Sequence, residues 1–235
     1  MENIKINKIN LFKILFYKFP ENLLACFRLN VLPLHFLAFL LTWFLVYFNF
    51  DWSYYLATQN SNLKYIFFPA LILGGLLPIL IPLFLYIYGK NKDEFNIIKI
   101  AGALGQAALL GLLLSFFYKA LTGRAQPDFY SSNILADLSH GFRFGLLRGG
   151  VFWGWPSSHT TIAFSMATAY IALYPKNRKV LFFALLCAFY VGIGVATVGI
   201  HWFSEFIAGA IFGSLTGTIV GSSYHRHKIQ TSVLR

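Results

Sequence analysis

Residues 65–88 have the sequence YIFFPALILGGLLPILIPLFLYIY, an unbroken apolar stretch long enough to cross a lipid bilayer. A membrane-spanning helix needs about 20 such residues. Comparable apolar runs recur at residues 31–50, 97–118, 158–174, 180–199 and 202–222. The chain has 235 residues, of which 57% are hydrophobic and only 11% charged, and this argues against an ordinary soluble domain. We therefore predict an all-α integral membrane protein built as a bundle of six transmembrane helices.

The net charge of +11 is distributed unevenly between the two sides of this six-helix arrangement. Fourteen of the 19 Lys and Arg residues lie before the first run, beside the second and fourth connections, or after the last run. The five on the other side are Lys64, Lys119, Arg124, Arg143 and Arg148. Because basic loops stay in the cytoplasm, we place both termini there, in the inner (cytoplasmic) membrane of a bacterium. The charge excess then reflects topology and anionic lipid, and we expect no nucleic-acid partner.

The sequence divides into three segments. Residues 1–30 alternate lysines with large apolar side chains, which is typical of a helix lying in the headgroup region, so we predict an interfacial amphipathic segment. Residues 31–222 form the six-helix membrane domain, and residues 223–235 form a basic cytoplasmic tail. Between the third and fourth helices, residues 119–156 are rich in glycine and aromatic residues. We predict that they form an ordered cap on the extracytoplasmic side.

Ionisable side chains at membrane depth are costly and therefore indicate a functional site. Three polar clusters fall at the same predicted depth, on the extracytoplasmic side. The first ends the third apolar run, the second opens the fourth, and the third opens the sixth. These clusters are Lys119, Arg124 and Gln126; Pro156, Ser157, Ser158 and His159; and His201 and Glu205.

The residue types in these clusters suit phosphoryl transfer. The start of the fourth helix exposes backbone N–H groups that can hold an anion, and His159 beside them can protonate a leaving oxygen. His201 and Glu205 are four residues apart, so the carboxylate can orient the imidazole and leave its other nitrogen as a nucleophile. Lys119 and Arg124 supply positive charge for phosphate oxygens. Each cluster alone has a structural explanation: a helix cap, a histidine–carboxylate pair that satisfies itself, and a lysine that extends to the headgroups. The three clusters together indicate metal-free phosphoryl transfer. We expect no cofactor.

The order and spacing of these clusters resemble the type 2 phosphatidate phosphatase superfamily, the membrane lipid-phosphate phosphatases related to vanadium haloperoxidases. That family's first motif is Lys, six residues and Arg-Pro, which Lys119 and Pro127 match while Gln126 replaces the arginine. Its second motif, Pro-Ser-Gly-His, is matched by residues 156–159, with Ser158 in place of glycine.

The third family motif is Arg, five residues, His, three residues and Asp. His201 and Glu205 match its end, but Val195 stands at the arginine position. The resemblance covers roughly residues 60–222, and its second motif is the most specific.

The resemblance implies a role for each matched residue. His201 would be the nucleophile, His159 the general acid, and Glu205 the carboxylate that orients His201. The implied phosphate contacts are Lys119, Gln126, Ser157 and Ser158. Since the two family arginines are replaced, we expect another arginine to bind phosphate, and the candidates are Arg124, Arg143 and Arg148. Arg148 is preferred because the glycines that follow it permit close approach to the second motif.

By this resemblance the chain is a membrane lipid-phosphate phosphatase that acts at the extracytoplasmic face through a phosphohistidine intermediate. Its substrate would be phosphatidate, phosphatidylglycerophosphate, a polyprenyl diphosphate or lipid A, and its other partners are membrane lipids. The replaced arginines keep two alternatives open. One is a headgroup phosphotransferase of the sphingomyelin-synthase-like kind, and the other is a catalytically silent lipid-binding member of the fold. The sequence does not indicate an oligomeric state.

Overall fold

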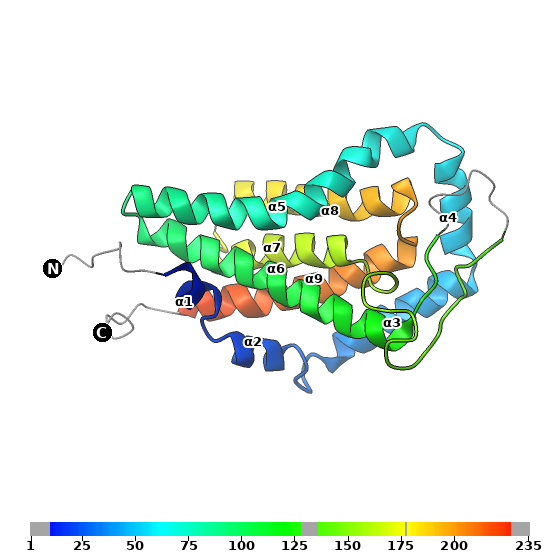
Figure 1. Ribbon diagram of the computed structural model, residues 1–235, viewed down its shortest axis with the longest axis horizontal. Coiled ribbons are helices and arrows are strands. Elements are labelled where there is room, and N and C mark those ends of the chain that lie inside the picture. Colours follow the sequence, from blue (N-terminus) through cyan, green and yellow to red (C-terminus); the bar gives the residue numbers. More distant parts are fainter. Residues whose placement is uncertain (1–9, 128–135, 177, 227–235) are drawn as a thin grey trace.

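The fold is that of a computed structural model, which describes residues 10–127, 136–176 and 178–226 (Figure 1). All regular secondary structure in these described ranges is helical. The helices are α1 (Leu11–Leu15), α2 (Phe19–Ala25), α3 (Leu32–Tyr47), α4 (Phe50–Gln59), α5 (Leu63–Asn91), α6 (Phe95–Thr122), α7 (Ser158–Leu173), α8 (Arg178–Val198) and α9 (Phe203–Arg226).

Each of the six predicted apolar runs contains one helix, namely α3, α5, α6, α7, α8 or α9. Four of them, α5, α6, α8 and α9, are long and apolar enough to cross a membrane. Helices α3 and α4 meet this criterion only as a pair, which is bent by 68°. Helix α7 has 16 residues, fewer than the usual span of about 20. The chain is thus an integral membrane protein, and the number of six crossings remains a prediction.

Helix α7 lies inside the bundle, packed against α5, α6, α8 and α9 (Figure 1). Its closest neighbour is α9, which turns a row of glycines toward it. The row consists of Gly209, Gly213, Gly217 and Gly221. A Cβ atom at Gly217 would lie only 2.1 Å from the Ser165 carbonyl oxygen of α7. Small residues at this spacing let two membrane helices approach closely, and this approach brings the start of α7 beside the start of α9.

The N-terminal segment forms two short helices that pack against the bundle. The buried side chain of Gln106 in α6 donates to the carbonyl oxygens of Leu15 and Tyr17, at 2.6 and 2.9 Å. Its amide oxygen accepts from Asn22 at 2.7 Å. These bonds satisfy carbonyls that α1 leaves free at its C-terminus. A headgroup position for residues 1–30 remains a prediction, and residues 1–9 lie outside the described part of the chain.

The segment that follows α6 has an irregular backbone in its described residues. Helix α6 ends at Gly123, whose φ of 48° is left-handed, as is common for glycine at this position. The amides of Arg143, Gly145 and Leu147 then donate to the carbonyls of residues 120–122. The segment is thereby fixed to the end of α6. Its assignment as an extracytoplasmic cap remains a prediction, as does the basic tail, of which residues 227–235 lie outside the described ranges.

Candidate active site

The three polar clusters predicted from the sequence meet at one end of the bundle. They lie at the end of α6, at the start of α7, and in the turn between α8 and α9 together with the first turn of α9 (Figure 1). The ring centroids of His159 and His201 are 6.3 Å apart. The Ser157 amide donates to the Glu205 carbonyl oxygen at 3.1 Å, which ties the second cluster to the third.

His201 and Glu205 form a buried hydrogen-bonded pair. His201 Nδ1 is 2.5 Å from Glu205 Oε2, and both side chains are almost inaccessible to solvent. Because a carboxylate only accepts hydrogen bonds, the proton of the imidazole belongs on Nδ1. The Nε2 lone pair is then free to attack an electrophile.

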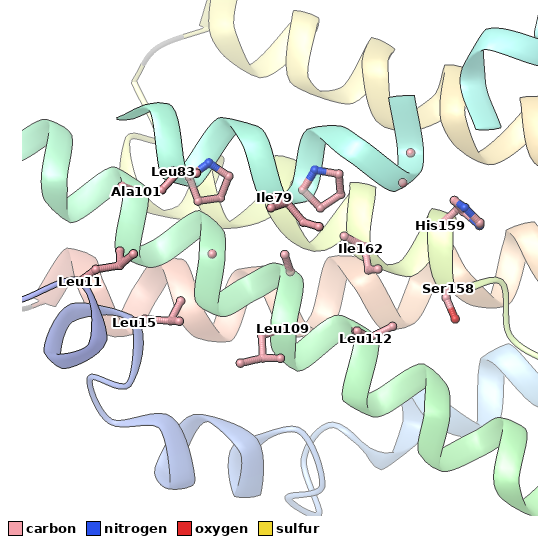
Figure 2. Close-up of a pocket in the computed structure, with 16 residues that line it drawn as sticks. Leu11, Leu15, Ile79, Leu83, Ala101, Leu109, Leu112, Ser158, His159 and Ile162 are labelled. Carbon is pink, nitrogen blue, oxygen red and sulfur yellow. The ribbon is translucent and has the colours of Figure 1, made fainter. Parts of the chain in front are cut away.

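His159 lies in the first turn of α7, next to the helix start that carries the free amides. Its Nδ1 atom is buried and has no hydrogen-bond partner among the described residues. Buried polar atoms are nearly always paired, so an unpaired one in a cleft indicates a role in binding or proton transfer. His159 and Ser158 lie together at one end of an apolar groove between α5, α6 and α7 (Figure 2).

The two serines of the second cluster differ in their surroundings. Ser157 is fully buried and caps α7, because its hydroxyl accepts from the Thr160 amide at 3.4 Å and from the Thr160 hydroxyl at 3.0 Å. The Ser158 hydroxyl shares a 2.9 Å hydrogen bond with Ser115 of α6 and borders the groove. Ser157 therefore shapes the helix start, and a phosphate contact from either serine remains a prediction.

Lys119 is a buried cation at the end of α6. Its side chain is 1% exposed, and its Nζ atom donates to the Phe152 carbonyl oxygen at 2.9 Å. An ammonium group has three N–H donors. One of them is used by this backbone contact, which leaves donors for phosphate oxygens.

Arg124 is bonded to several protein groups. Its guanidinium is 2.6 Å from Asp51 Oδ2 and 3.5 Å from Glu205 Oε1, and it donates to the Ser204 hydroxyl at 2.8 Å. The Glu205 carboxylate therefore lies between two partners, His201 at one oxygen and Arg124 at the other. The two partners hold the Glu205 carboxylate in place. A phosphate contact from Arg124 remains a prediction.

Asp51 and Ser204 were not predicted from the sequence. Asp51 is fully buried in the first turn of α4, and its Oδ1 atom accepts from the Ser204 amide at 2.7 Å. A signal was present, because the chain has only eight acidic residues and Asp51 directly follows an apolar run. The sequence gives no sign, however, that it pairs with Ser204 and Arg124, which are far away along the chain.

The two positions that lack the family arginines hold Val195, which is buried, and Gln126, which is partly buried. Val195 is fully buried in α8. In one orientation of its amide, Gln126 donates to Glu205 Oε2 at 3.3 Å. In the other orientation it donates to the Ile200 carbonyl and accepts from the Gly154 amide at 2.8 Å. In either orientation, Gln126 bonds to protein groups at or beside the His201–Glu205 pair.

Arg148 is not brought together with the other predicted site residues. Its side chain is exposed and its guanidinium lies against Gly145, whose added Cβ would be 2.7 Å from Nε. No hydrogen bond links its side chain to any of the described residues of the site. Its role as a phosphate ligand remains a prediction.

The fold is that of a helical membrane protein whose three polar clusters meet at one end of the bundle. The family model described as "PAP2 superfamily" matches residues 100–229, which contain all three polar clusters. The chain therefore belongs to the PAP2 superfamily, as the resemblance in its motifs predicted.

Similar proteins and a solved structure agree with this family. The chain is 28% identical over 162 residues to a lipid A 1-phosphatase of Rhizobium etli, covering 63% of this chain and 66% of the relative. It is 35% identical over 101 residues to a lipid A 4'-phosphatase of Bacteroides thetaiotaomicron, covering 43% of each. The matched segments thus span less than two thirds of each relative.

The fold resembles the crystal structure of a transmembrane PAP2-type phosphatidylglycerolphosphate phosphatase from Bacillus subtilis. The TM-score is 0.56 at 16% sequence identity, and the alignment covers 85% of this chain and 98% of the other. At this identity the likeness concerns the fold alone.

Proposed function

We propose that this protein is a membrane lipid phosphatase that removes a phosphate from a lipid at the extracytoplasmic face of the membrane. The observation that carries the proposal is the His201–Glu205 pair with His159 beside it, at a ring distance of 6.3 Å. One histidine is oriented as a nucleophile, and the other has an unpaired buried nitrogen. Two histidines in these complementary roles are what phosphohistidine chemistry needs.

The first step forms the phosphohistidine. Nε2 of His201 attacks the phosphorus atom, and the bond between phosphorus and the lipid oxygen breaks. Protonated His159 gives its proton to that oxygen, so the dephosphorylated lipid leaves as an alcohol. Glu205 holds the Nδ1 proton of His201 and stabilises the positive charge that develops on the ring.

The second step releases inorganic phosphate. His159, now neutral, takes a proton from a water molecule, and the resulting hydroxide attacks the phosphorus atom. The bond between phosphorus and His201 breaks, which regenerates both histidines. The Lys119 ammonium and the free amides at the start of α7 stabilise the charge on the phosphate oxygens in both steps.

Among the possible lipids, we favour a lipid A type of substrate. The relatives from Rhizobium etli and Bacteroides thetaiotaomicron are lipid A phosphatases of two kinds, one acting at the 1-position and one at the 4'-position. Phosphatidate, phosphatidylglycerophosphate and a polyprenyl diphosphate present the same phosphate chemistry and serve as comparison substrates.

Phosphate release from these four lipids by the purified protein tests the proposal. We expect release from at least one lipid and a loss of about 10²–10⁴-fold in His159→Ala, since general acid–base catalysis contributes this much. The control is His225→Ala, an exposed histidine near the opposite end of α9. Transfer of the phosphorylated headgroup to an acceptor lipid without free phosphate would instead identify a phosphotransferase. Absence of turnover on every lipid would identify a silent lipid-binding protein.

Two neighbouring glycines of α5 offer a matched test of how His159 is held. A Cβ atom at Gly74 would lie 3.1 Å from the His159 ring and 2.8 Å from Val191. At Gly75 a Cβ atom would meet nothing within 4 Å. We expect Gly74→Ala to lower the unfolding free energy by about 1–3 kcal/mol, as overpacking does, and to slow phosphate release. Thermal unfolding should show no such loss of stability in Gly75→Ala, and equal unfolding of the two variants would contradict the tight packing.

A further inference from the structure

The apolar groove beside His159 runs along the bundle as far as the N-terminal helix. It has a volume of about 530 Å³ and lies between α5, α6 and α7. Figure 2 shows Ser158 and His159 at one end and Leu11 and Leu15 of α1 at the other. This volume falls within the range of small-molecule sites, about 300–1,000 Å³.

The groove is polar only at its catalytic end. Ser158 and His159 are its polar lining residues, and the rest of the lining consists of aliphatic residues, glycine and proline. A ligand that matches this pattern has a phosphate at one end and a single hydrocarbon chain extending from it. Among membrane components, one acyl chain of a lipid phosphate has this chemistry.

The inner end of the groove is a wall formed by α1. Leu15 reaches the floor of the groove at Gly105, where an added Cβ would be 2.9 Å from Leu15 Cδ1 and 3.4 Å from Pro82 Cβ. The leucine side chains of α1 at this end of the groove limit how far the hydrocarbon chain of a ligand can extend.

The wall is held in place by hydrogen bonds to the bundle. The Leu11 amide donates to the Tyr86 hydroxyl at 3.1 Å, and the Leu15 carbonyl oxygen accepts from the buried Gln106 at 2.6 Å. The Tyr224 hydroxyl of α9 donates to the Ile14 carbonyl oxygen. Three different helices, α5, α6 and α9, thus hold α1 by hydrogen bonds.

We propose that α1 determines the acyl-chain length that the enzyme accepts, with Leu11 and Leu15 closing the groove that holds one chain of the lipid substrate. This proposal rests on the proposed lipid phosphatase function. Along α6 the groove extends from Leu112 to Gly105, where Leu15 lies, over about 11 Å at 1.5 Å per residue. An extended hydrocarbon chain advances about 1.2 Å per bond, so about nine bonds fit before Leu15.

The test compares Leu15→Ala with the wild type on the lipid phosphate that is hydrolysed best, in versions that differ only in acyl length. Removing the outer carbons of this leucine lengthens the groove by about two to three bonds. We expect the chain length with the highest kcat/KM to increase by that amount, with a water-soluble aryl phosphate as the reference substrate for each protein. Phe12→Ala is the matched control, because Phe12 is on α1 but exposed and outside the groove. An unchanged length profile in folded Leu15→Ala would overturn the proposal.

A second variant fills the groove. Gly105→Leu places a side chain between Leu15 and Pro82, and we expect long-chain hydrolysis to fall by about tenfold while hydrolysis of the aryl phosphate persists. An equal fall for both substrates would overturn the proposal.

A binding measurement separates this inference from the proposed function. Binding of single-chain alkylphosphonates of graded length requires no catalysis. A length optimum in the wild type that moves in Leu15→Ala would support the α1 wall even if no lipid is hydrolysed. Equal binding of all lengths by both proteins would overturn it, even if the protein is an active phosphatase.

Discussion

His201→Ala is expected to slow phosphate release by a factor on the order of 10⁴ or more, because it removes the atom that forms the bond to phosphorus. The variant should still fold, since Glu205 keeps its contact with Arg124 at 3.5 Å. The measurement is kcat for the best lipid substrate, together with acid- and base-quenched reactions that detect an acid-labile phosphoryl-enzyme. We expect the wild type to form such an intermediate and His201→Ala to form none.

Glu205→Gln provides a graded comparison. A glutamine can still accept from Nδ1 of His201, but it does not stabilise the charge that develops on the ring. We expect its rate to lie between those of the wild type and His201→Ala, with the phosphoryl-enzyme still detectable. A His201→Ala variant that keeps wild-type activity would reassign the nucleophile, and the unpaired His159 would be the next residue to test.

The main helices could be predicted from the sequence because the length of each apolar run indicates a helix. Helix α4 (Phe50–Gln59) was missed, since it has 10 residues and follows a sharp bend at Asn49, whose φ is 58°. The 16-residue α7 shows the opposite case. Its bounds agree with the predicted run at residues 158–174 to within one residue, although it is shorter than the usual membrane span.

The site was predictable where its residues are close in the sequence. His201 and Glu205 are one helical turn apart, and their contact follows from that spacing. Arg124 was predicted as a free phosphate ligand, but the structure pairs it with Asp51, 73 residues away. Such a pairing depends on the path of α3 and α4, and no local pattern encodes it.

Asp51→Ala is expected to lower the unfolding free energy by about 3–5 kcal/mol, because it leaves the buried Arg124 without its closest counter-charge. It also removes the oxygen that accepts from the Ser204 amide at 2.7 Å. Thermal unfolding of the purified protein measures the effect. The control is Glu94→Ala, which removes an exposed carboxylate.

The same variant should reveal that Asp51 positions the catalytic pair. Once Asp51 is gone, Arg124 is free to move toward Glu205, and a stronger hold on Glu205 Oε1 pulls the carboxylate away from His201. Small displacements of catalytic groups cost up to about 10²-fold in rate. We therefore expect kcat to fall while KM changes little, which a purely structural role of Asp51 would not produce.

The double variant Asp51→Leu/Arg124→Met decides whether the pair acts as a unit. Replacing a buried ion pair by apolar side chains often restores stability, whereas removing one partner does not. We expect the double variant to unfold at a higher temperature than Asp51→Ala and yet to keep a reduced kcat, because Glu205 has lost its second partner. If the destabilisation by the two substitutions is additive, Asp51 and Arg124 are independent and the network described around Glu205 does not hold.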